Sequence, residues 1–427
     1  MDDTNGAIGA SAPLLRGLDS EPLTSIPPII VRYRHGRDGS IRFVSHTKHA
    51  LCHSWVNVLL VFVPVGIAVK AVGLSAGLIF AMNAIAIIPL AGLLSHATEC
   101  VASRLGDTIG ALINVTFGNA VELIIFIIAL VKDEIRVVQA SLLGSILANL
   151  LLIMGMAFLL GGLRFQEQIY NSTVTQMSAC LLSLSVMSLL LPTAFHASWS
   201  DNTAADKYTL KVSRGTSVVL LLVYVLYIVF QLKSHSYLYA SIPQQIIDEE
   251  SHPGVLADFM NHSSDSSSIV MLLLSTGLVA VCAEFLVDAI PEMIESSSVS
   301  EAFIGLIILP IVGNAAEHVT AVSVATKNKM DLSIGVSVGS SIQIAIFVTP
   351  LVVILGWCMD KDMSLYFTLF ETISLFVTAF VVNFLVLDGR SNYLEGALLI
   401  AAYVIIGVAA FFYPPASQSS DVASAGY

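Results

Sequence analysis

The chain has 427 residues, of which 56% are apolar and only 12% are charged. An average soluble domain is about a quarter charged, so this composition excludes a disordered chain, a nucleic-acid-binding protein and an ordinary soluble enzyme. It indicates a polytopic membrane protein. The formal net charge is −12, and the informative question is which acids lie inside the membrane. The five cysteines lack CxxC spacing, so neither a disulfide framework nor a cysteine metal site is predicted.

The first 50 residues are polar and are expected to form a cytoplasmic N-terminal tail, residues 1–50. The tail shows no apolar region followed by a small-residue cleavage site, so no signal peptide is predicted. It contains six Lys and Arg residues, and this positive charge is what assigns the N-terminus to the cytoplasm.

Apolar runs of membrane length follow one another through the rest of the chain. Each can cross about 30 Å of hydrocarbon as a helix, and the short connections make neighbouring helices antiparallel. The sequence therefore predicts an all-α polytopic membrane protein with eleven transmembrane helices. We place the runs at 55–72, 76–97, 107–131, 137–162, 171–193, 213–232, 269–290, 301–325, 332–357, 364–387 and 393–413.

The longest gap between apolar runs, residues 233–268, is an acidic loop that includes Asp248, Glu249 and Glu250. We interpret it as a solvated cytoplasmic segment, because a run of charge is usually just solvated. A cation-sensing segment is the weaker alternative.

Two pairs of short motifs recur at one constant offset. Gly118-Asn119-Ala120-Val121-Glu122 matches Gly313-Asn314-Ala315-Ala316-Glu317, and Gly144-Ser145 matches Gly339-Ser340, in both cases 195 residues apart. The chain is therefore interpreted as a leading helix, residues 51–75, and two five-helix repeats, 76–232 and 269–413, followed by a C-terminal tail, 414–427. Because five is odd, the second repeat enters the membrane from the opposite side. Such inverted repeats are typical of secondary transporters with a binding site near the midplane.

The motifs place polar side chains on shared helix faces inside apolar spans, because positions three or four apart are neighbours on a helix. Charged and amide groups at this depth are costly and normally face a protein interior or a water-filled path. The inverted symmetry is expected to bring the two Asn/Glu faces together. The residues concerned are Asn119 with Glu122, Asn314 with Glu317, Ser145 with Asn149, and Ser340 with Gln343.

The side chains of these residues offer oxygen ligands. The Gly-Asn and Gly-Ser segments are expected to be kinked, which would free backbone carbonyl oxygens as further ligands. Ca²⁺ takes 6–8 such ligands in flexible geometry, and Mn²⁺ also accepts them. Only His318 adjoins the motifs, so a Zn²⁺ or Cu⁺ site is disfavoured. The alternative interpretation of these residues is structural. A single glutamate in a membrane span is often protonated and forms a hydrogen bond between helices, and serines often form hydrogen bonds between packed helices. Asn149 and Gln343 have no polar counterpart at the matching offset, so the two half-sites are not expected to be equivalent.

Further acids lie near the ends of the spans and are candidates for an access path or gate. They are Glu99 in the second span, and Glu284 and Asp288 in the seventh. The alternative is that they sit at the interface in water. His318 is a candidate for tuning cation choice or proton affinity.

The expected mechanism follows from charge. Desolvation disfavours an ionised carboxyl group, so an empty site is expected to hold protons, and a divalent cation neutralises the same two carboxylates. If only these loaded forms rearrange across the membrane, the result is cation/proton antiport without covalent chemistry. No nucleotide-binding motif is present, so the energy is expected to come from an ion gradient, with no cofactor and no enzymatic activity.

Four segments resemble the signature repeats of the Ca²⁺/H⁺ exchanger family, within the cation/Ca²⁺ exchanger superfamily. They are GNAVELI (118–124), QASLLGSILANLLL (139–152), FIGLIILPIVGNAAEHVTAV (303–322) and GSSIQIAIFVTP (339–350). The resemblance extends over roughly residues 50–413 and is greatest to the fungal vacuolar exchangers. The acidic segment 233–268 is shorter than the family pattern implies, which puts a sensing role in doubt.

This resemblance implies an eleven-helix fold and export of cytosolic Ca²⁺ into an acidic vacuole, with the N-terminus cytoplasmic and the C-terminus lumenal. Glu122 and Glu317 would be the carboxylates that alternately carry Ca²⁺ and H⁺. The flanking site residues would be Asn119, Asn314, Ser145, Ser340 and Gln343, and the acids of the access paths would be Glu99, Glu284 and Asp288.

Other classes of protein stay open. The first alternative is a Na⁺/Ca²⁺ exchanger of the same superfamily. The repeats of those exchangers resemble G-T-S-x-P-[ED], whereas both copies in this chain read Gly-Asn-Ala-x-Glu. A passive cation channel would dissipate a gradient without proton counterflow. An intramembrane protease ranks last, since no YD…GxGD pair and no GxSG lies in a span. The oligomeric state, including a homo-oligomer, is not determined by the sequence.

Overall fold

The computed structural model describes residues 55–103, 105, 110, 113, 116–199, 202–234, 265–297 and 299–414. Every described residue belongs to the unit formed by residues 46–427. The predicted tail 1–50, most of the acidic loop 233–268 and most of the tail 414–427 lie outside the described residues.

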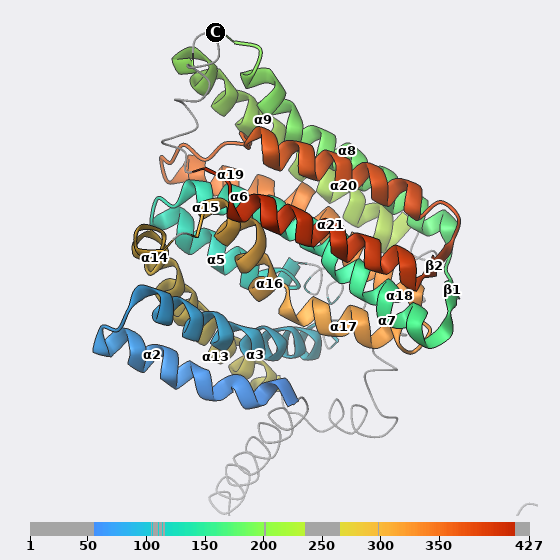
Figure 1. Ribbon diagram of the computed structural model, residues 1–427, viewed down its shortest axis with the longest axis horizontal. Coiled ribbons are helices and arrows are strands. Elements are labelled where there is room, and N and C mark those ends of the chain that lie inside the picture. The colour runs from blue at the N-terminus through green and yellow to red at the C-terminus, as the bar shows by residue number, and fades with distance from the viewer. Residues whose placement is uncertain are drawn as a thin grey trace, which may run out of the picture. The chain divides into compact units, whose positions relative to one another are not determined.

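The described unit is mostly helical (Figure 1). In the first part of the chain its elements are η1 (Trp55–Val61), α2 (Phe62–Val72), α3 (Ala76–Ala102), α5 (Ala120–Val131), α6 (Ile135–Leu147), η2 (Ala148–Ile153), α7 (Met154–Phe165), β1 (Glu167–Ile169), α8 (Ser172–His196), α9 (Asn202–Val229) and η3 (Phe230–Ser234). In the second part they are α13 (Asp265–Asp288), α14 (Ile290–Ser296), α15 (Glu301–Phe303), η4 (Ile304–Ile308), α16 (Leu309–Gly313), α17 (Ala315–Ala325), α18 (Met330–Gln343), η5 (Ile344–Val348), α19 (Thr349–Cys358), α20 (Leu369–Leu385), β2 (Arg390–Asn392) and α21 (Tyr393–Phe411).

Seven of the described helical segments are long and apolar enough to cross a membrane. An eighth candidate span consists of Glu301–Gly313 and Ala315–Ala325, which are bent by 60° relative to each other. Shorter apolar helices at Val56–Val72, Ala120–Val131 and Leu369–Leu385 lie within the remaining predicted spans, and Ala120–Val131 covers only the second half of the predicted span 107–131. A helical protein with several membrane-spanning candidates is therefore confirmed, while the number of eleven stays a prediction.

Neighbouring helices pack in groups that bring distant segments of the chain together. Helix α3 packs against α2 and α13, α7 packs against α21, and α8 packs against α20 (Figure 1). Large apolar side chains remain exposed on α9, α20 and α21, for example Leu226, Phe384 and Ile405. In a membrane protein such outer faces contact hydrocarbon.

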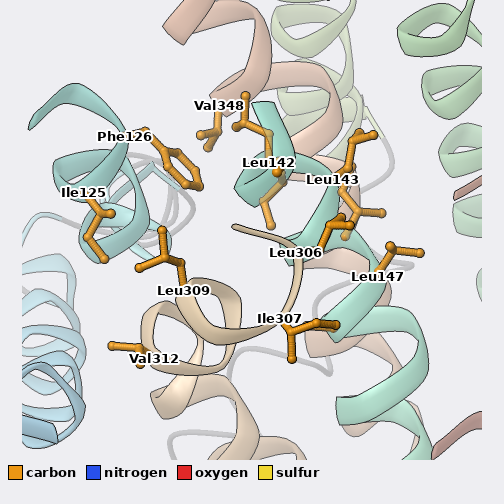
Figure 2. Close-up of a cluster of buried hydrophobic side chains, with 14 of the residues drawn as sticks. Ile125, Phe126, Leu142, Leu143, Leu147, Leu306, Ile307, Leu309, Val312 and Val348 are labelled. Carbon is orange, nitrogen blue, oxygen red and sulfur yellow. The ribbon is translucent and has the colours of Figure 1, made fainter. Parts of the chain in front are cut away.

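A tight apolar cluster surrounds the contact between α6 and η4 (Figure 2). A Cβ atom added at Gly144 would lie 2.5 Å from the carbonyl oxygen of Leu306, so only a glycine permits this approach of α6 to the backbone of η4. The labelled side chains of the cluster are Ile125, Phe126, Leu142, Leu143, Leu147, Leu306, Ile307, Leu309, Val312 and Val348.

Three segments, η2, η4 and η5, are π turns within longer helices. Such turns interrupt the regular hydrogen-bond ladder and are frequent at functional sites. The expectation of a kink at the Gly-Ser segments was wrong, because α6 is regular through Gly144 and Ser145 and α18 is regular through Gly339 and Ser340. The irregular turns begin a few residues later, at Ala148 and Ile344.

The sequence did not predict the short antiparallel pair of strands β1 and β2, in which Gln168 lies opposite Ser391. The buried side chain of Gln168 donates hydrogen bonds to the carbonyl oxygen of Ala325, at 2.9 Å, and to Oδ1 of Asn328, at 3.0 Å. These bonds join the sheet to the end of α17.

Candidate functional site

The two Asn-Ala-x-Glu motifs have nearly the same local backbone. Asn119 precedes α5 with φ −95° and ψ 24°, and Asn314 precedes α17 with φ −94° and ψ 18°. Each therefore marks the start of a helix, but neither side chain makes the capping hydrogen bond that usually favours asparagine there. Glu122 and Glu317 consequently lie in the first turn of α5 and α17, where the helix dipole and free N–H groups favour negative charge.

The carboxyl group of Glu122 is buried where three elements meet. Its Oε1 accepts hydrogen bonds from the hydroxyl group of Ser145, on α6, and from Nδ2 of Asn314, at 2.6 Å. A Cβ atom added at Gly313 would lie 2.9 Å from Cγ of Glu122. The glycine of the motif therefore makes room for the carboxylate of the other motif.

Both asparagines use their amide N–H groups within the protein. Asn314 also donates to the carbonyl oxygen of Pro310, at 3.0 Å, and Asn119 donates to Oε1 of Gln343, at 2.8 Å. Three buried acceptors have no hydrogen-bond partner among the described residues, namely Oε2 of Glu122 and the Oδ1 atoms of Asn119 and Asn314. Unpaired buried polar atoms typically cost about 1–3 kcal/mol each, and carboxylate and amide oxygens are ligands that hard cations accept.

The second half-site is built differently. Glu317 is half-buried, and its carboxyl group lies close enough to Glu122 for their charges to interact. Ser340 is also half-buried, and in the described part of the chain no hydrogen bond joins it to Glu317, whereas the matching Ser145 does bond to Glu122. The expected inequality of the two half-sites is therefore present in the geometry.

Two further predicted residues lie on the site helices. Nδ1 of His318 donates to the carbonyl oxygen of Asn314 at 2.6 Å, while its Nε2 is buried with no partner among the residues described. Asn149 is fully buried in η2, and neither atom of its amide has a partner in that part of the chain. Both side chains thus keep polar atoms available inside the protein.

The acids at the span ends do not join this cluster through any hydrogen bond or ion pair between described residues. Asp288 pairs with Lys132 at 2.6 Å and with Lys70 at 3.4 Å, and Glu284 pairs with Lys132 at 3.7 Å. The hydrogen bond and charge of Asp288 raise the pKa of Lys132 above its usual value. Glu99 is half-buried and accepts a 3.5 Å hydrogen bond from Ser95.

Sequence reasoning missed the two lysines that hold these acids. Lys70 and Lys132 stand at the ends of predicted spans, which is a signal for charge at the membrane surface. Asp288 follows Lys70 by 218 residues and Lys132 by 156 residues. These ion pairs therefore depend on how α2, α5 and α13 pack. Spacing along the chain carries no information on that packing.

The donors of the candidate site are mainly oxygen atoms. Among the described residues no group of three or more His, Cys, Asp and Glu side chains could hold a metal ion. The site instead combines two carboxyl groups with amide and hydroxyl oxygens. Oxygen sets of this kind suit Ca²⁺ and similar hard cations.

Comparison with known proteins agrees with this chemistry. The family model described as sodium/calcium exchanger protein matches residues 75–233 and 267–412. The vacuolar calcium ion transporter of Schizosaccharomyces pombe is 46% identical over 374 residues, which are 88% of this chain and 89% of that protein. The Ca²⁺/H⁺ antiporter of Aphanothece halophytica is 42% identical over 83% of this chain and 96% of its own.

The fold has solved counterparts as well. The structure of native YfkE matches with a TM-score of 0.71 and 34% sequence identity, covering 84% of this chain and 100% of that one. A second structure of YfkE describes it as a Ca²⁺/H⁺ antiporter. The chain therefore belongs to the sodium/calcium exchanger protein family, and its resemblance to the Ca²⁺/H⁺ exchangers is confirmed.

Proposed function

We propose that this protein is a secondary active antiporter that moves cytosolic Ca²⁺ into an acidic vacuole in exchange for H⁺. The names of the relatives support this function, since they include a vacuolar calcium ion transporter and a Ca²⁺/H⁺ antiporter. The same names support a transporter as the class of protein. Mn²⁺ is a second candidate substrate, because it accepts the same oxygen ligands.

The observation that carries the proposal is the set of three buried acceptor oxygens on Glu122, Asn119 and Asn314 that lack partners among the described residues. The amide N–H groups of both asparagines are already engaged with protein acceptors. Oriented in this way, the amides present oxygen rather than nitrogen to whatever enters the site. Oxygen atoms presented in this way can bind a cation, whereas an anion would need N–H donors.

The proposed cycle depends on keeping the site neutral. Glu122 and Glu317 would hold protons when the site lacks Ca²⁺, because a charged carboxyl group without a partner is costly inside the membrane. Ca²⁺ would replace those protons by neutralising both carboxylates. An unloaded, ionised site would not cross between the two open states, which couples the flow of Ca²⁺ to the flow of H⁺.

The fold that we propose for this cycle has eleven transmembrane helices: a leading helix, 51–75, and two inverted repeats, 76–232 and 269–413. Matching features support it. The backbone angles at Asn119 and Asn314 agree closely, and π turns begin at Ala148 and Ile344, close to the same offset of 195. The N-terminal tail would be cytoplasmic, with the acidic loop 233–268, and the C-terminal tail 414–427 would be lumenal.

Within this scheme each site residue has a proposed role. Glu122 and Glu317 carry the exchanged ions, and Asn119, Asn314, Ser145, Ser340 and Gln343 complete the ligand set or fix its geometry. Asn149 and His318 adjoin the site and tune its affinity for cations or protons. Glu99, Glu284 and Asp288 belong to the access paths or gates, and no bound cofactor takes part.

Transport by the purified protein in sealed vesicles with an acidic interior tests the function. External Ca²⁺ is added while ⁴⁵Ca uptake and internal pH are followed together. Antiport predicts Ca²⁺ uptake that alkalinises the interior and does not depend on Na⁺. Uptake that requires a Na⁺ gradient would support a Na⁺/Ca²⁺ exchanger, and uptake without any proton movement would support a passive channel. Either result would contradict the proposal.

A further inference from the structure

Helix α9 carries no residue of the two repeated motifs, yet one of its side chains reaches the segments that form the site. Tyr224 is 6% exposed, and its ring is stacked on that of Phe347, with the centroids 4.6 Å apart and the planes inclined by 21°. The buried hydroxyl group of Tyr224 lies beside the side chain of Thr116. A single side chain therefore contacts both the segment before α5 and the π turn η5.

Both contacts fall close to an amide of the site. Thr116 precedes Asn119 by three residues, and Phe347 follows Gln343 by four. Thr116 and Asn119 lie in the stretch that leads into α5, and Gln343 and Phe347 lie where α18 passes into η5. Asn119 and Gln343 are themselves joined by the 2.8 Å hydrogen bond from Nδ2 to Oε1. Tyr224 thus reaches the same two segments as this amide pair, three residues from Asn119 and four from Gln343 along the chain.

We propose that Tyr224 is a positioning residue that fixes the separation of these two segments and thereby sets the selectivity of the site among divalent cations. The inference rests on the proposed function, because it requires a site that takes such cations. Tyr224 does not itself bind the cation. It holds the Asn119 and Gln343 amides at a spacing suited to the larger Ca²⁺.

The size of the cation makes this spacing important. Ca²⁺ takes oxygen ligands at about 2.3–2.6 Å in flexible geometry, while Mg²⁺ requires about 2.0–2.1 Å. Mn²⁺ is also smaller than Ca²⁺ and accepts similar ligands. A stacked pair of rings that fixes the position of η5 keeps these amides at one spacing, so they adjust poorly to a smaller ion. Without the stack, η5 would be free to shift relative to the segment before α5, and the preference for Ca²⁺ would fall.

The same helix provides a matched control. Tyr208 lies towards the other end of α9 and is stacked on Trp199, with centroids 5.1 Å apart and planes inclined by 19°. Replacing Tyr208 removes the same kind of contact from the same helix without touching η5 or Thr116. Tyr208→Leu therefore separates a general loss of packing in α9 from an effect on the site.

The test compares Tyr224→Leu, Tyr224→Phe and Tyr208→Leu with the unsubstituted protein in sealed vesicles. KM and Vmax are measured for Ca²⁺ and for Mn²⁺, and stabilisation of the detergent-purified protein against heat by each ion gives a second readout of binding. We expect Tyr224→Leu to raise KM for Ca²⁺ about fivefold, the change that follows if the interaction energy of one stacked pair serves entirely to hold the site in its Ca²⁺-binding form, and to leave KM for Mn²⁺ unchanged or lower. Tyr224→Phe keeps the ring and should change the Ca²⁺/Mn²⁺ ratio less than Tyr224→Leu, and Tyr208→Leu should not change it.

An unchanged Ca²⁺/Mn²⁺ ratio in a folded Tyr224→Leu protein would overturn the inference. An equal loss of Vmax for both ions would overturn it too, because that is the behaviour of a merely structural contact. If Tyr224→Leu does not fold, Phe347→Leu removes the other ring of the stack and is judged by the same ratio. If the unsubstituted protein neither binds nor transports Ca²⁺, the proposed function fails and the inference fails with it.

Discussion

Asn314 donates a 2.6 Å hydrogen bond to Oε1 of Glu122, so the asparagine of one motif contacts the carboxyl group of the other across 192 residues of sequence. This bond ties the break between α16 and α17 to the first turn of α5. It also fixes the amide of Asn314 with its oxygen unpaired among the described residues. One contact thus joins the two motifs and orients an amide oxygen that we propose as a ligand for the cation.

The first prediction concerns this bond. Asn314→Ala removes both the donor to Glu122 and the unpaired oxygen. Because hydrogen bonds to charged groups contribute about 1.5–3 kcal/mol, we expect KM for Ca²⁺ to rise at least about tenfold. Initial rates of uptake over a range of Ca²⁺ concentrations measure it. Asn383→Ala, in α20, is the control, because its amide contacts Ser183 away from the site. A KM within twofold of the unsubstituted value for Asn314→Ala would contradict the account.

The two serines of the repeated Gly-Ser pair are predicted to differ. Ser145 donates to Glu122, whereas between described residues no such bond joins Ser340 to Glu317. Ser145→Ala should therefore reduce Ca²⁺ transport more than Ser340→Ala, with a gap of several-fold in Vmax/KM. Measuring both variants in the same vesicles makes each the control for the other. Equal effects would mean that the asymmetry of the two half-sites has no consequence for transport.

The glycines of the same pairs give a prediction about packing. A Cβ atom at Gly144 would lie 2.5 Å from the backbone of Leu306, but one at Gly339 would have no atom within 4 Å among the described residues. Gly144→Ala should push α6 away from η4 and lower both the melting temperature and the rate of transport. Gly339→Ala should be neutral or slightly stabilising, since alanine favours a helix by about 1 kcal/mol over glycine. Thermal unfolding in detergent measures the difference, and a harmless Gly144→Ala would refute the close α6–η4 contact.

The ion pair between Lys132 and Asp288 predicts a dependence on salt and pH. These side chains are partly exposed, so the pair should contribute only about 0–1 kcal/mol and should weaken in 1 M KCl. Its hydrogen bond raises the pKa of Lys132, so Lys132 stays charged below its ordinary pKa of about 10.4. The contribution should therefore be constant between pH 7 and 9 and be lost as pH rises through the raised pKa.

A double-mutant cycle checks this pair. Melting temperatures are measured for Lys132→Gln, Asp288→Asn and the double variant, at low and high salt, at pH 7 and 9. The decrease in melting temperature of the double variant should be smaller than the sum of the two single decreases, because either substitution alone already removes the ion pair. Fully additive losses, or a contribution that disappears between pH 7 and 9, would contradict the pairing.

Much of the site could be predicted because polar residues are so costly in an apolar span. Glu122, Asn119 and Asn314 stand out for that reason, and their repetition at one offset identified them as partners before any contact was known. The same symmetry predicted that the two Asn/Glu faces approach each other, and in the structure Asn314 contacts Glu122. The helices themselves follow from the requirement that every backbone group be satisfied inside the membrane.

Other features depend on packing that spacing does not encode. The π turn at Ala148 begins after the Gly-Ser pair rather than at it, because Gly144 serves the close approach to Leu306 instead of a kink. The contact of Tyr224 with Phe347 joins residues 123 positions apart, from an element without a motif. The sheet pairing of Gln168 and Ser391 lies in connections too short and too polar to reveal a strand.

The release of protons on Ca²⁺ binding tests the central claim most directly. Ca²⁺ is added to the detergent-purified protein in weak buffer at mildly acidic pH, and released H⁺ and bound ⁴⁵Ca are measured together. If Glu122 and Glu317 hold either protons or Ca²⁺, binding should release more than one and up to two H⁺ per Ca²⁺. The release should fall in Glu122→Gln and in Glu317→Gln and vanish in the double variant. Ca²⁺ binding without proton release, or undiminished release in the double variant, would contradict the account.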